Sequence, residues 1–281
     1  MRKLLLALML TALPMTTFAV PEWAKVNGVT LRYELSGKGS DTVVLLQESG
    51  VPLEIWDEIL PTLQAPNRTF LRYDLRGFGL SEKFRGPVTM QDEVNDLRAL
   101  LDALELRKPV VMLSGALGGS IALQFAAQFP DRVKGVVVTS PSAVLAAKPP
   151  RARVNAAADP AAARAADERT LKVTYPVEFR ANAERWNKYL GMYYANDPDS
   201  EIATEALINT TAFAGVLPKI QCPTLLVATT KFVRPVGEVR ELATKIPKGR
   251  FVALETGHFA SYQSPELTAP VFLQFMKELR L

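Results

Sequence analysis

Short apolar runs alternate with longer amphipathic stretches through most of this chain. A helix is expected to begin after Thr89, because Asp92 follows three residues later and apolar residues then recur with a helical period. Six runs rich in β-branched residues and leucine have the length and continuity of strands buried on both faces. These runs are residues 42–47, 69–73, 110–114, 133–139, 224–229 and 250–255. The alternation predicts an α/β fold with a mostly parallel twisted sheet and helices on both faces.

Two regions depart from this alternation. Residues 25–26 and 29–35 flank an Asn27-Gly28 pair, which predicts a tight hairpin and an antiparallel start to the sheet. Residues 142–219 begin with a stretch rich in Ala, Arg and Pro and continue with the aromatic residues Trp186, Tyr189, Tyr193 and Tyr194. Because aromatic side chains favour burial, we expect a helical lid inserted between two strands here, in preference to a disordered linker between domains.

The first nineteen residues have the pattern of a secretory signal peptide. Arg2 and Lys3 precede an apolar run over residues 4–13, and Thr17-Phe18-Ala19 is similar to a cleavage site. The apolar run is too short to span a bilayer. We therefore expect residues 1–19 to be removed, leaving one domain over residues 20–281 that is periplasmic or secreted and has no membrane contact.

Composition narrows the function classes. Lys and Arg total 33 against 29 Asp and Glu, and the basic residues are scattered, so a nucleic-acid partner is not expected. With one histidine and one cysteine, no metal site is expected. The sequence contains no phosphate-binding glycine loop and implies no cofactor. Cys222 is expected to be a small buried hydrophobic residue. The oligomeric state is left open.

A strand that turns sharply into a helix is predicted within residues 110–129, across the segment Ser-Gly-Ala-Leu-Gly-Gly. This is the pattern of a nucleophile elbow, in which the neighbours two places on either side of the nucleophile must be small. Ser114 and Gly118 fit those places, but the nucleophile position between them is Ala116. Ser114 and Ser120 are expected to be structural, since centring the elbow on either one destroys the spacing.

These segments together resemble the α/β-hydrolase superfamily over nearly all of residues 20–281. The matching segments occur in the order of that family: Arg-Tyr-Asp-Leu-Arg-Gly-Phe-Gly-Leu-Ser at 72–81, Ala-Leu-Gly-Gly at 116–119, Cys-Pro-Thr-Leu-Leu-Val at 222–227 and Gly-His-Phe at 257–259. Within the superfamily the chain is most similar to the 3-oxoadipate enol-lactonase-like esterases and lactonases. The resemblance implies a small-molecule ester or lactone as ligand.

The resemblance also assigns positions to a catalytic triad, and the triad is degenerate. His258 lies where the family has its catalytic base, although a lone histidine is ordinarily structural. The position of the orienting acid is Phe232, and the alternative acid site at Ser140-Pro-Ser also lacks a carboxylate. With Ala116 at the nucleophile position, two of the three triad members are missing.

The oxyanion hole departs from the family pattern as well. The backbone N–H of Leu117, directly after the elbow, is one expected donor. Gln47, Glu48 and Ser49 stand where the family usually has His-Gly and supplies the second donor. A loop glutamate is ordinarily exposed to solvent. If Glu48 faces inward instead, it becomes the best local candidate for an orienter of His258 or a base.

Three functions remain open from the sequence. The first is weak hydrolysis of an ester or lactone without a covalent intermediate, through His258. The second is non-catalytic binding of a small ligand in the periplasm. The third is an ordinary hydrolase in which serine was deliberately replaced by alanine. The family resemblance favours a hydrolase, and the sequence does not decide between turnover and binding.

Overall fold

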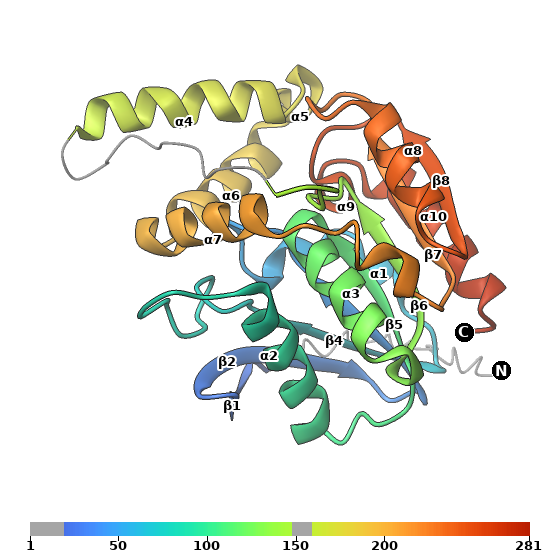
Figure 1. Ribbon diagram of the computed structural model, residues 1–281. Coiled ribbons are helices and arrows are strands. Elements are labelled where there is room, and N and C mark those ends of the chain that lie inside the picture. The colour runs from blue at the N-terminus through green and yellow to red at the C-terminus, as the bar shows by residue number, and fades with distance from the viewer. Residues whose placement is uncertain (1–19, 148–158) are drawn as a thin grey trace, which may run out of the picture.

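The computed structural model describes residues 20–147 and 159–281 of the chain (Figure 1). The predicted signal peptide at residues 1–19 lies outside the described residues, and so does part of the predicted Ala-rich stretch, residues 148–158. Within the described ranges no helix is long and apolar enough to cross a membrane.

One sheet of eight strands forms the centre of the molecule, in the order β1-β2-β4-β3-β5-β6-β7-β8. The pairs β1–β2 and β2–β4 are antiparallel and all the others are parallel. This confirms the predicted fold class and the antiparallel start. The strands are β1 (Glu22–Val26), β2 (Val29–Gly37), β3 (Asp41–Leu46), β4 (Arg68–Tyr73), β5 (Val110–Gly115), β6 (Val133–Thr139), β7 (Thr224–Thr229) and β8 (Gly249–Leu254).

The hairpin between β1 and β2 turns at the predicted pair. Asn27 and Gly28 have φ angles of 46° and 78°, the left-handed conformation that a two-residue hairpin turn requires at both central positions. The Asn27 side-chain amide donates a hydrogen bond of 2.7 Å to Asp96. The turn is therefore tied to the helix that packs beneath it.

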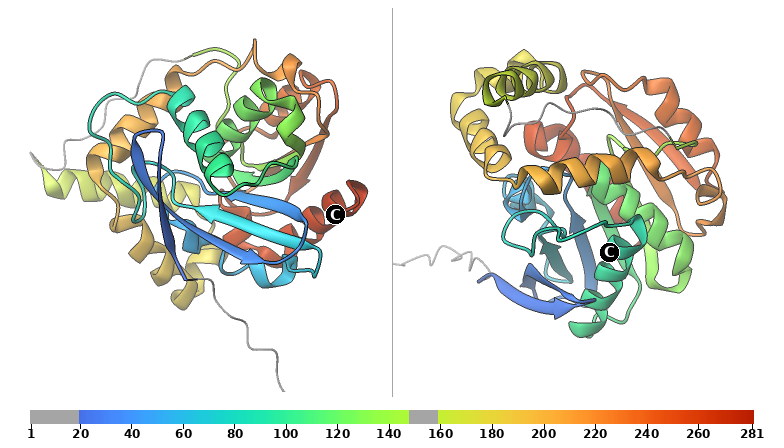
Figure 2. Two further views of the ribbon diagram at one scale, coloured as in Figure 1. Left: turned by 90° about the horizontal axis from the view of Figure 1, so that it is seen from below. Right: turned by 60° about the vertical axis from the view of Figure 1, so that its left-hand side comes forward.

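Helices cover both faces of the sheet. One hydrophobic core lies between the sheet and α2, α3 and α8, and a second lies between the opposite face and α1, α9, α10 and part of the segment between β6 and β7 (Figures 1 and 2). Neighbouring residues of β3 divide between them, Val44 entering the first core and Val43 the second. The helices outside the β6–β7 segment are α1 (Leu60–Leu63), α2 (Met90–Ala103), α3 (Ala116–Gln128), α8 (Val236–Thr244), α9 (Ala260–Gln263) and α10 (Pro265–Glu278).

Two expectations about single elements have different outcomes. The helix expected after Thr89 is confirmed as α2, where Thr89 and Asp92 form a capping box. The expectation that every predicted strand is buried on both faces is wrong for β8, whose residues are exposed or half-buried. The reason is its place at the edge of the sheet, where neighbouring elements only partly cover it.

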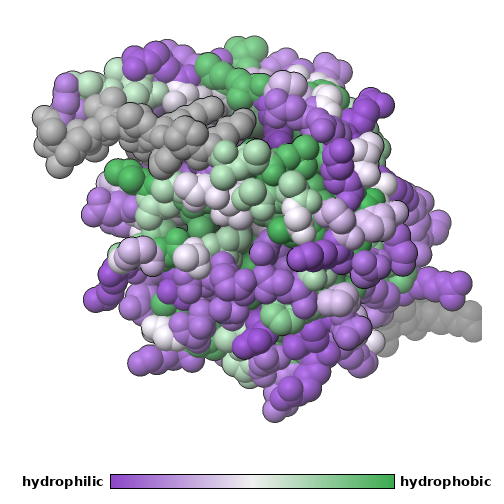
Figure 3. Space-filling view, viewed as in Figure 1, coloured by the Kyte–Doolittle hydropathy of each residue, from purple (hydrophilic) through white to green (hydrophobic). Residues whose placement is uncertain are grey.

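Among the described residues between β6 and β7 there are four α-helices, which we call the lid: α4 (Pro160–Thr174), α5 (Val177–Ala181), α6 (Ala183–Tyr194) and α7 (Pro198–Thr210). Tyr189 is buried and its ring stacks between Trp186 and Tyr193, while Tyr194 is half exposed. On the face shown in Figure 3 apolar residues gather in the upper half, near α4, and the lower half is largely hydrophilic. Among the lid aromatics, Phe179 and Tyr189 belong to the same buried core as residues of β3.

Candidate functional site

The turn from β5 into α3 has the geometry of the predicted elbow. Ala116, the first residue of α3, has a φ of 38°, a left-handed conformation that side chains other than glycine rarely adopt. A Cβ added at Gly118 would collide with the carbonyl oxygens of Leu46 and Gln47. The strand and the helix therefore approach as closely as an elbow requires, and the strained position carries only a methyl group.

The two serines near the elbow are held by structural hydrogen bonds. Ser114 is fully buried and its hydroxyl donates to the Val137 carbonyl oxygen at 2.7 Å. The Ser120 hydroxyl lies 2.9 Å from that of Ser142. These contacts agree with the structural roles expected for both residues.

His258 follows β8 and meets a carboxylate from the opposite side of the site. Its Nε2 atom lies 2.8 Å from Oε2 of Glu48. Glu48 is only 3% exposed, so the interpretation of it as a solvated loop residue is wrong. An ionised carboxylate only accepts hydrogen bonds. Nε2 is the imidazole nitrogen nearest to this carboxylate, but the contact is an ion-pair distance and not an aligned hydrogen bond, because Oε2 of Glu48 is buried without a hydrogen-bond partner among the described residues.

The other side of the imidazole lies against an aromatic ring. The centroids of Phe232 and His258 are 4.1 Å apart with an interplanar angle of 30°. In the described parts of the chain no hydrogen-bond partner reaches the buried Nδ1 atom of His258. The carboxylate of the site thus comes from the loop after β3 and contacts Nε2, whereas the acid position of the family would serve Nδ1.

Backbone contacts fix the loop that carries His258. The Ser140 hydroxyl donates to the His258 carbonyl oxygen at 2.6 Å, and it lies 2.7 Å from the Thr229 hydroxyl. The His258 N–H donates to the carbonyl oxygen of Thr174, the last residue of α4, at 3.4 Å. Ser140 was considered in the sequence only as an empty acid site. In the structure it anchors His258, and the lid provides a second anchor.

The two segments expected to supply the oxyanion hole, the start of α3 and the loop after β3, meet at Gly118. The Gly118 N–H donates to the Gln47 carbonyl oxygen at 3.1 Å, which joins the loop after β3 to the elbow. Leu117 is buried in the first turn of α3, where backbone N–H groups have no acceptor within the helix. Ser49 is half-buried and lines a cavity of about 120 Å³ with Gly50 and lid residues of α6 and α7.

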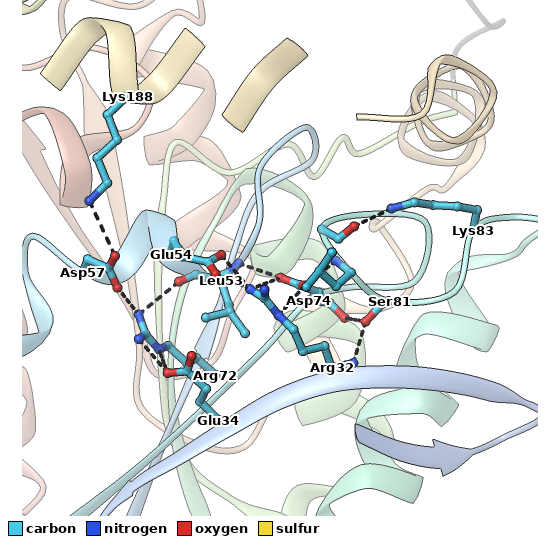
Figure 4. Close-up of polar contacts among 12 residues, drawn as sticks. Arg32, Glu34, Leu53, Glu54, Asp57, Arg72, Asp74, Ser81, Lys83 and Lys188 are labelled. Carbon is cyan, nitrogen blue, oxygen red and sulfur yellow. Dashed lines mark hydrogen bonds and ion pairs between the residues drawn. The ribbon is translucent and has the colours of Figure 1, made fainter. Parts of the chain in front are cut away.

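A buried ion-pair network holds the segment that follows the Glu48 loop (Figure 4). Asp74 forms an ion pair of 2.9 Å with Nε of Arg32 and accepts hydrogen bonds of 2.7 Å from the N–H groups of Leu53 and Leu80. Burial raises the pKa of Asp74 to about 6, against the lowering by Arg32 and the two N–H donors. Asp74 thereby fastens the segment that follows the Glu48 loop to the loop after β4.

The same network reaches the lid. Arg72 forms ion pairs with Glu34 at 2.7 Å and with Asp57 at 2.6 Å. Asp57 in turn lies 3.5 Å from Nζ of Lys188 on α6, which Figure 4 shows extending down from the lid. The family motif at 72–81 contains Arg72 and Asp74, but the sequence predicted no ion-pair role for either of them. Their partners lie outside that motif and carry no local signal.

Comparison with known proteins identifies the fold family. A family model described as the alpha/beta hydrolase fold matches residues 50–265. The chain belongs to the α/β-hydrolase family. Its structure is similar to an enol-lactonase from Burkholderia xenovorans, with a TM-score of 0.82 and 22% identity over 91% of this chain and 100% of that one. It is also similar to a thermophilic esterase from Thermogutta terrifontis, with a TM-score of 0.80 and 23% identity over 94% of this chain and 100% of that one.

Sequence relatives are matched over shorter stretches. A pimeloyl-[acyl-carrier protein] methyl ester esterase of Pectobacterium carotovorum is 29% identical over 119 residues, 42% of this chain and 44% of that protein. The first curated relatives are likewise matched over less than half of their length. For this α/β-hydrolase, the resemblance to enol-lactonases and esterases thus holds at the level of the fold. The geometry of the site, and not these relatives, bears on the reaction.

Few reactive groups are present among the described residues of the site. Ala116 supplies no attacking atom, and Glu48 and His258 are the titratable pair in contact. Nowhere in the described ranges do three or more His, Cys, Asp or Glu side chains form a group that could hold a metal ion. The arrangement can accept a proton and donate hydrogen bonds.

Proposed function

We propose that this α/β-hydrolase cleaves a carboxylic ester or lactone with a water molecule in place of the missing serine hydroxyl. The observation that carries the proposal is the contact of 2.8 Å between Glu48 Oε2 and His258 Nε2. A carboxylate and an imidazole are thus retained together at a site that has lost its nucleophile and its usual acid. General-base activation of water needs such a pair and no covalent intermediate.

The contacts favour Glu48 as the base and His258 as the group that orients it. With the proton of a neutral imidazole on Nε2, the nitrogen nearest to Glu48, the lone pair lies on Nδ1. Nδ1 is buried, so bulk water does not reach that lone pair. The Glu48 carboxylate retains further lone pairs for a water molecule.

The reaction follows from these roles. The water oxygen bonds to the carbonyl carbon while its proton passes to Glu48. The resulting oxyanion accepts hydrogen bonds from the backbone N–H groups of Leu117 and of the Gln47–Ser49 loop. The bond to the alcohol oxygen then breaks, and the proton on Glu48 passes to that oxygen. Ester and water become acid and alcohol, and the site returns to its first state.

The test compares Glu48→Gln with Glu255→Gln on a panel of activated aryl esters and small lactones. Glu255 is an exposed glutamate directly after β8, so its variant controls for loss of a charge near the site. We expect Glu48→Gln to lower kcat by ~10² to 10⁴ and the control to leave it unchanged. Equal activity of the two variants would contradict the proposal.

Two further measurements separate this route from covalent ones. A single turnover in ¹⁸O-water is expected to place the label in the product acid, whereas an unlabelled first product would mean that Glu48 attacks the carbonyl itself. A burst of released alcohol from the unmodified chain would indicate an acyl-enzyme and overturn the water route. Full activity in Ala116→Ser alone would instead identify an ordinary triad that lost only its serine.

Ligand binding without turnover is the second candidate. It is favoured by the contact of Phe232 with His258, because an aromatic ring at the acid position makes the site more apolar. Calorimetry with a non-hydrolysable lactone analogue tests it. Tight binding by both the unmodified chain and Glu48→Gln, with no turnover by either, would favour a binding protein.

A further inference from the structure

Two lid tyrosines continue the contact between His258 and Glu48. The hydroxyl of Tyr175 lies 3.5 Å from Oε1 of Glu48, and the hydroxyl of Tyr189 lies 2.5 Å from that of Tyr175. Four polar side chains thus run in single file from the loop after β8, through the loop after β3, to the end of α4 and to α6. Tyr175 reaches the carboxylate oxygen that His258 does not contact, and Tyr189 reaches Tyr175.

The direction of these hydrogen bonds follows from which groups keep their protons. Burial, together with the neighbouring Glu48, raises the pKa of both phenols well above the usual value, so both stay protonated. Each phenol has one proton to donate, and the carboxylate only accepts. Tyr175 therefore donates to Glu48 and accepts from Tyr189.

The backbone holds Tyr175 beside the site. It caps the C-terminus of α4 and precedes Pro176, so the chain changes direction at this residue. The preceding residue, Thr174, accepts a hydrogen bond from the His258 N–H. The lid thus meets the pair through a backbone contact to His258 and a side-chain contact to Glu48.

Packing alone would be served by phenylalanine at both positions. The rings of Tyr175 and Tyr189 lie among Phe179 and Trp186 in an aromatic cluster, where a buried hydroxyl without a partner is costly. We propose that Tyr175 and Tyr189 are positioning residues that hold the Glu48 carboxylate in place and make its reactivity depend on the seated lid. This inference rests on the proposed function.

The test uses Tyr175→Phe and Tyr189→Phe, with Tyr262→Phe as a matched control. Tyr262 is fully buried in the same aromatic cluster, but its hydroxyl donates to the backbone oxygen of Arg185. We expect kcat to fall about 10-fold in Tyr175→Phe and about 3-fold in Tyr189→Phe with little change in KM, as loss of one hydrogen bond implies. The acidic side of the pH–activity profile should shift along the pH axis in these two variants and should not shift in the control.

A second readout needs no substrate. The chain has a single histidine, so the ring ¹⁵N signals of His258 are unambiguous in NMR. We expect Tyr175→Phe to displace or broaden the Nε2–H signal and Tyr262→Phe to leave it unchanged. Identical His258 spectra in the two variants overturn the positioning role, whatever Glu48→Gln does to activity. A changed spectrum in a chain that hydrolyses nothing supports the positioning role and refutes the proposed hydrolysis.

Discussion

Asp74 and Glu48 are both buried carboxylates that follow neighbouring parallel strands, β4 and β3, yet their surroundings differ. Asp74 has an arginine and two backbone N–H groups within 2.9 Å. Glu48 has the imidazole of His258 at 2.8 Å and, within the described parts of the chain, one further polar contact, the Tyr175 hydroxyl at 3.5 Å. A carboxylate with all its lone pairs engaged holds loops together, whereas one with a free lone pair can receive a proton from a bound water molecule.

A third buried carboxylate extends the comparison. Glu93 on α2 is fully buried, and among the described residues neither of its side-chain oxygens has a hydrogen-bond partner. The hydroxyl of nearby Tyr73 is also buried without a hydrogen-bond partner among the described residues. Burial raises the pKa of Glu93 well above its usual value, and the neighbouring Asp96 adds to the rise. The three carboxylates therefore range from fully paired to unpaired.

The largest effect is expected at the fully paired carboxylate. Asp74→Ala leaves the Arg32 guanidinium buried with one carboxylate fewer and removes the acceptor of two N–H groups. We expect the free energy of unfolding to fall by about 3–5 kcal/mol, measured by urea denaturation at pH 7. A loss below about 1 kcal/mol would show that the network of Figure 4 is not what fastens these loops.

Substitution of Glu93, the carboxylate without a hydrogen-bond partner among the described residues, is expected to raise the free energy of unfolding instead of lowering it. Glu93 has a folded-state pKa above its unfolded value, so the unfolded chain releases this proton first as the pH rises. The free energy of unfolding should therefore fall with rising pH above the unfolded value, by up to ~1.4 kcal/mol per pH unit from this group. Glu93→Gln should flatten that slope and stabilise the protein at pH 7 by about 1–3 kcal/mol.

Other titratable groups lie near Glu93, and their contribution has to be kept constant in the comparison. Asp96 also has a raised pKa from burial, although it pairs with Arg76 at 2.6 Å, and Asp92 lies at the start of the same helix. The comparison is therefore made between Glu93→Gln and the unmodified chain at matched pH values from 5 to 8. Parallel stability curves would contradict a raised pKa of Glu93 in the folded protein.

A smaller effect is expected at the elbow. Ala116 adopts a φ of 38°, which costs an alanine but not a glycine. Ala116→Gly should raise the free energy of unfolding by about 1 kcal/mol or less. The same substitution at Ala122, inside α3 and fully buried, should lower it. Equal destabilisation by both would mean that the turn at Ala116 is not strained.

The smallest effect on stability is expected at Glu48. Glu48→Gln keeps the shape of the side chain and a hydrogen-bond acceptor for His258, so the free energy of unfolding should change by less than about 1 kcal/mol. Thermal denaturation of the purified variant tests this directly. A loss as large as that of Asp74→Ala would assign both carboxylates to structure and remove the contrast between them.

Local sequence signals predicted most of the fold. Runs of β-branched residues and leucine marked the strands because a strand covered on both faces is continuously apolar. Thr89 and Asp92 located the start of α2, and Asn27-Gly28 located the first hairpin, since capping and turn chemistry act over a few residues. The position of β8 at the sheet edge was missed, because strand order is set by long-range packing that composition does not encode.

Some features of the site were likewise predictable from the sequence, and others were not. The sequence by itself determined that Ala116 stands in a strained strand-to-helix turn and that Phe232 and His258 follow β7 and β8, because each position is tied to a local motif. Only the tertiary structure decided that Glu48 turns inward to His258, that Tyr175 meets its second oxygen and that Tyr189 meets Tyr175. These residues come from loops and helices more than a hundred positions apart in the extreme case. No local propensity sets the direction of a loop side chain, which depends on the charges and hydroxyls that the fold brings against it.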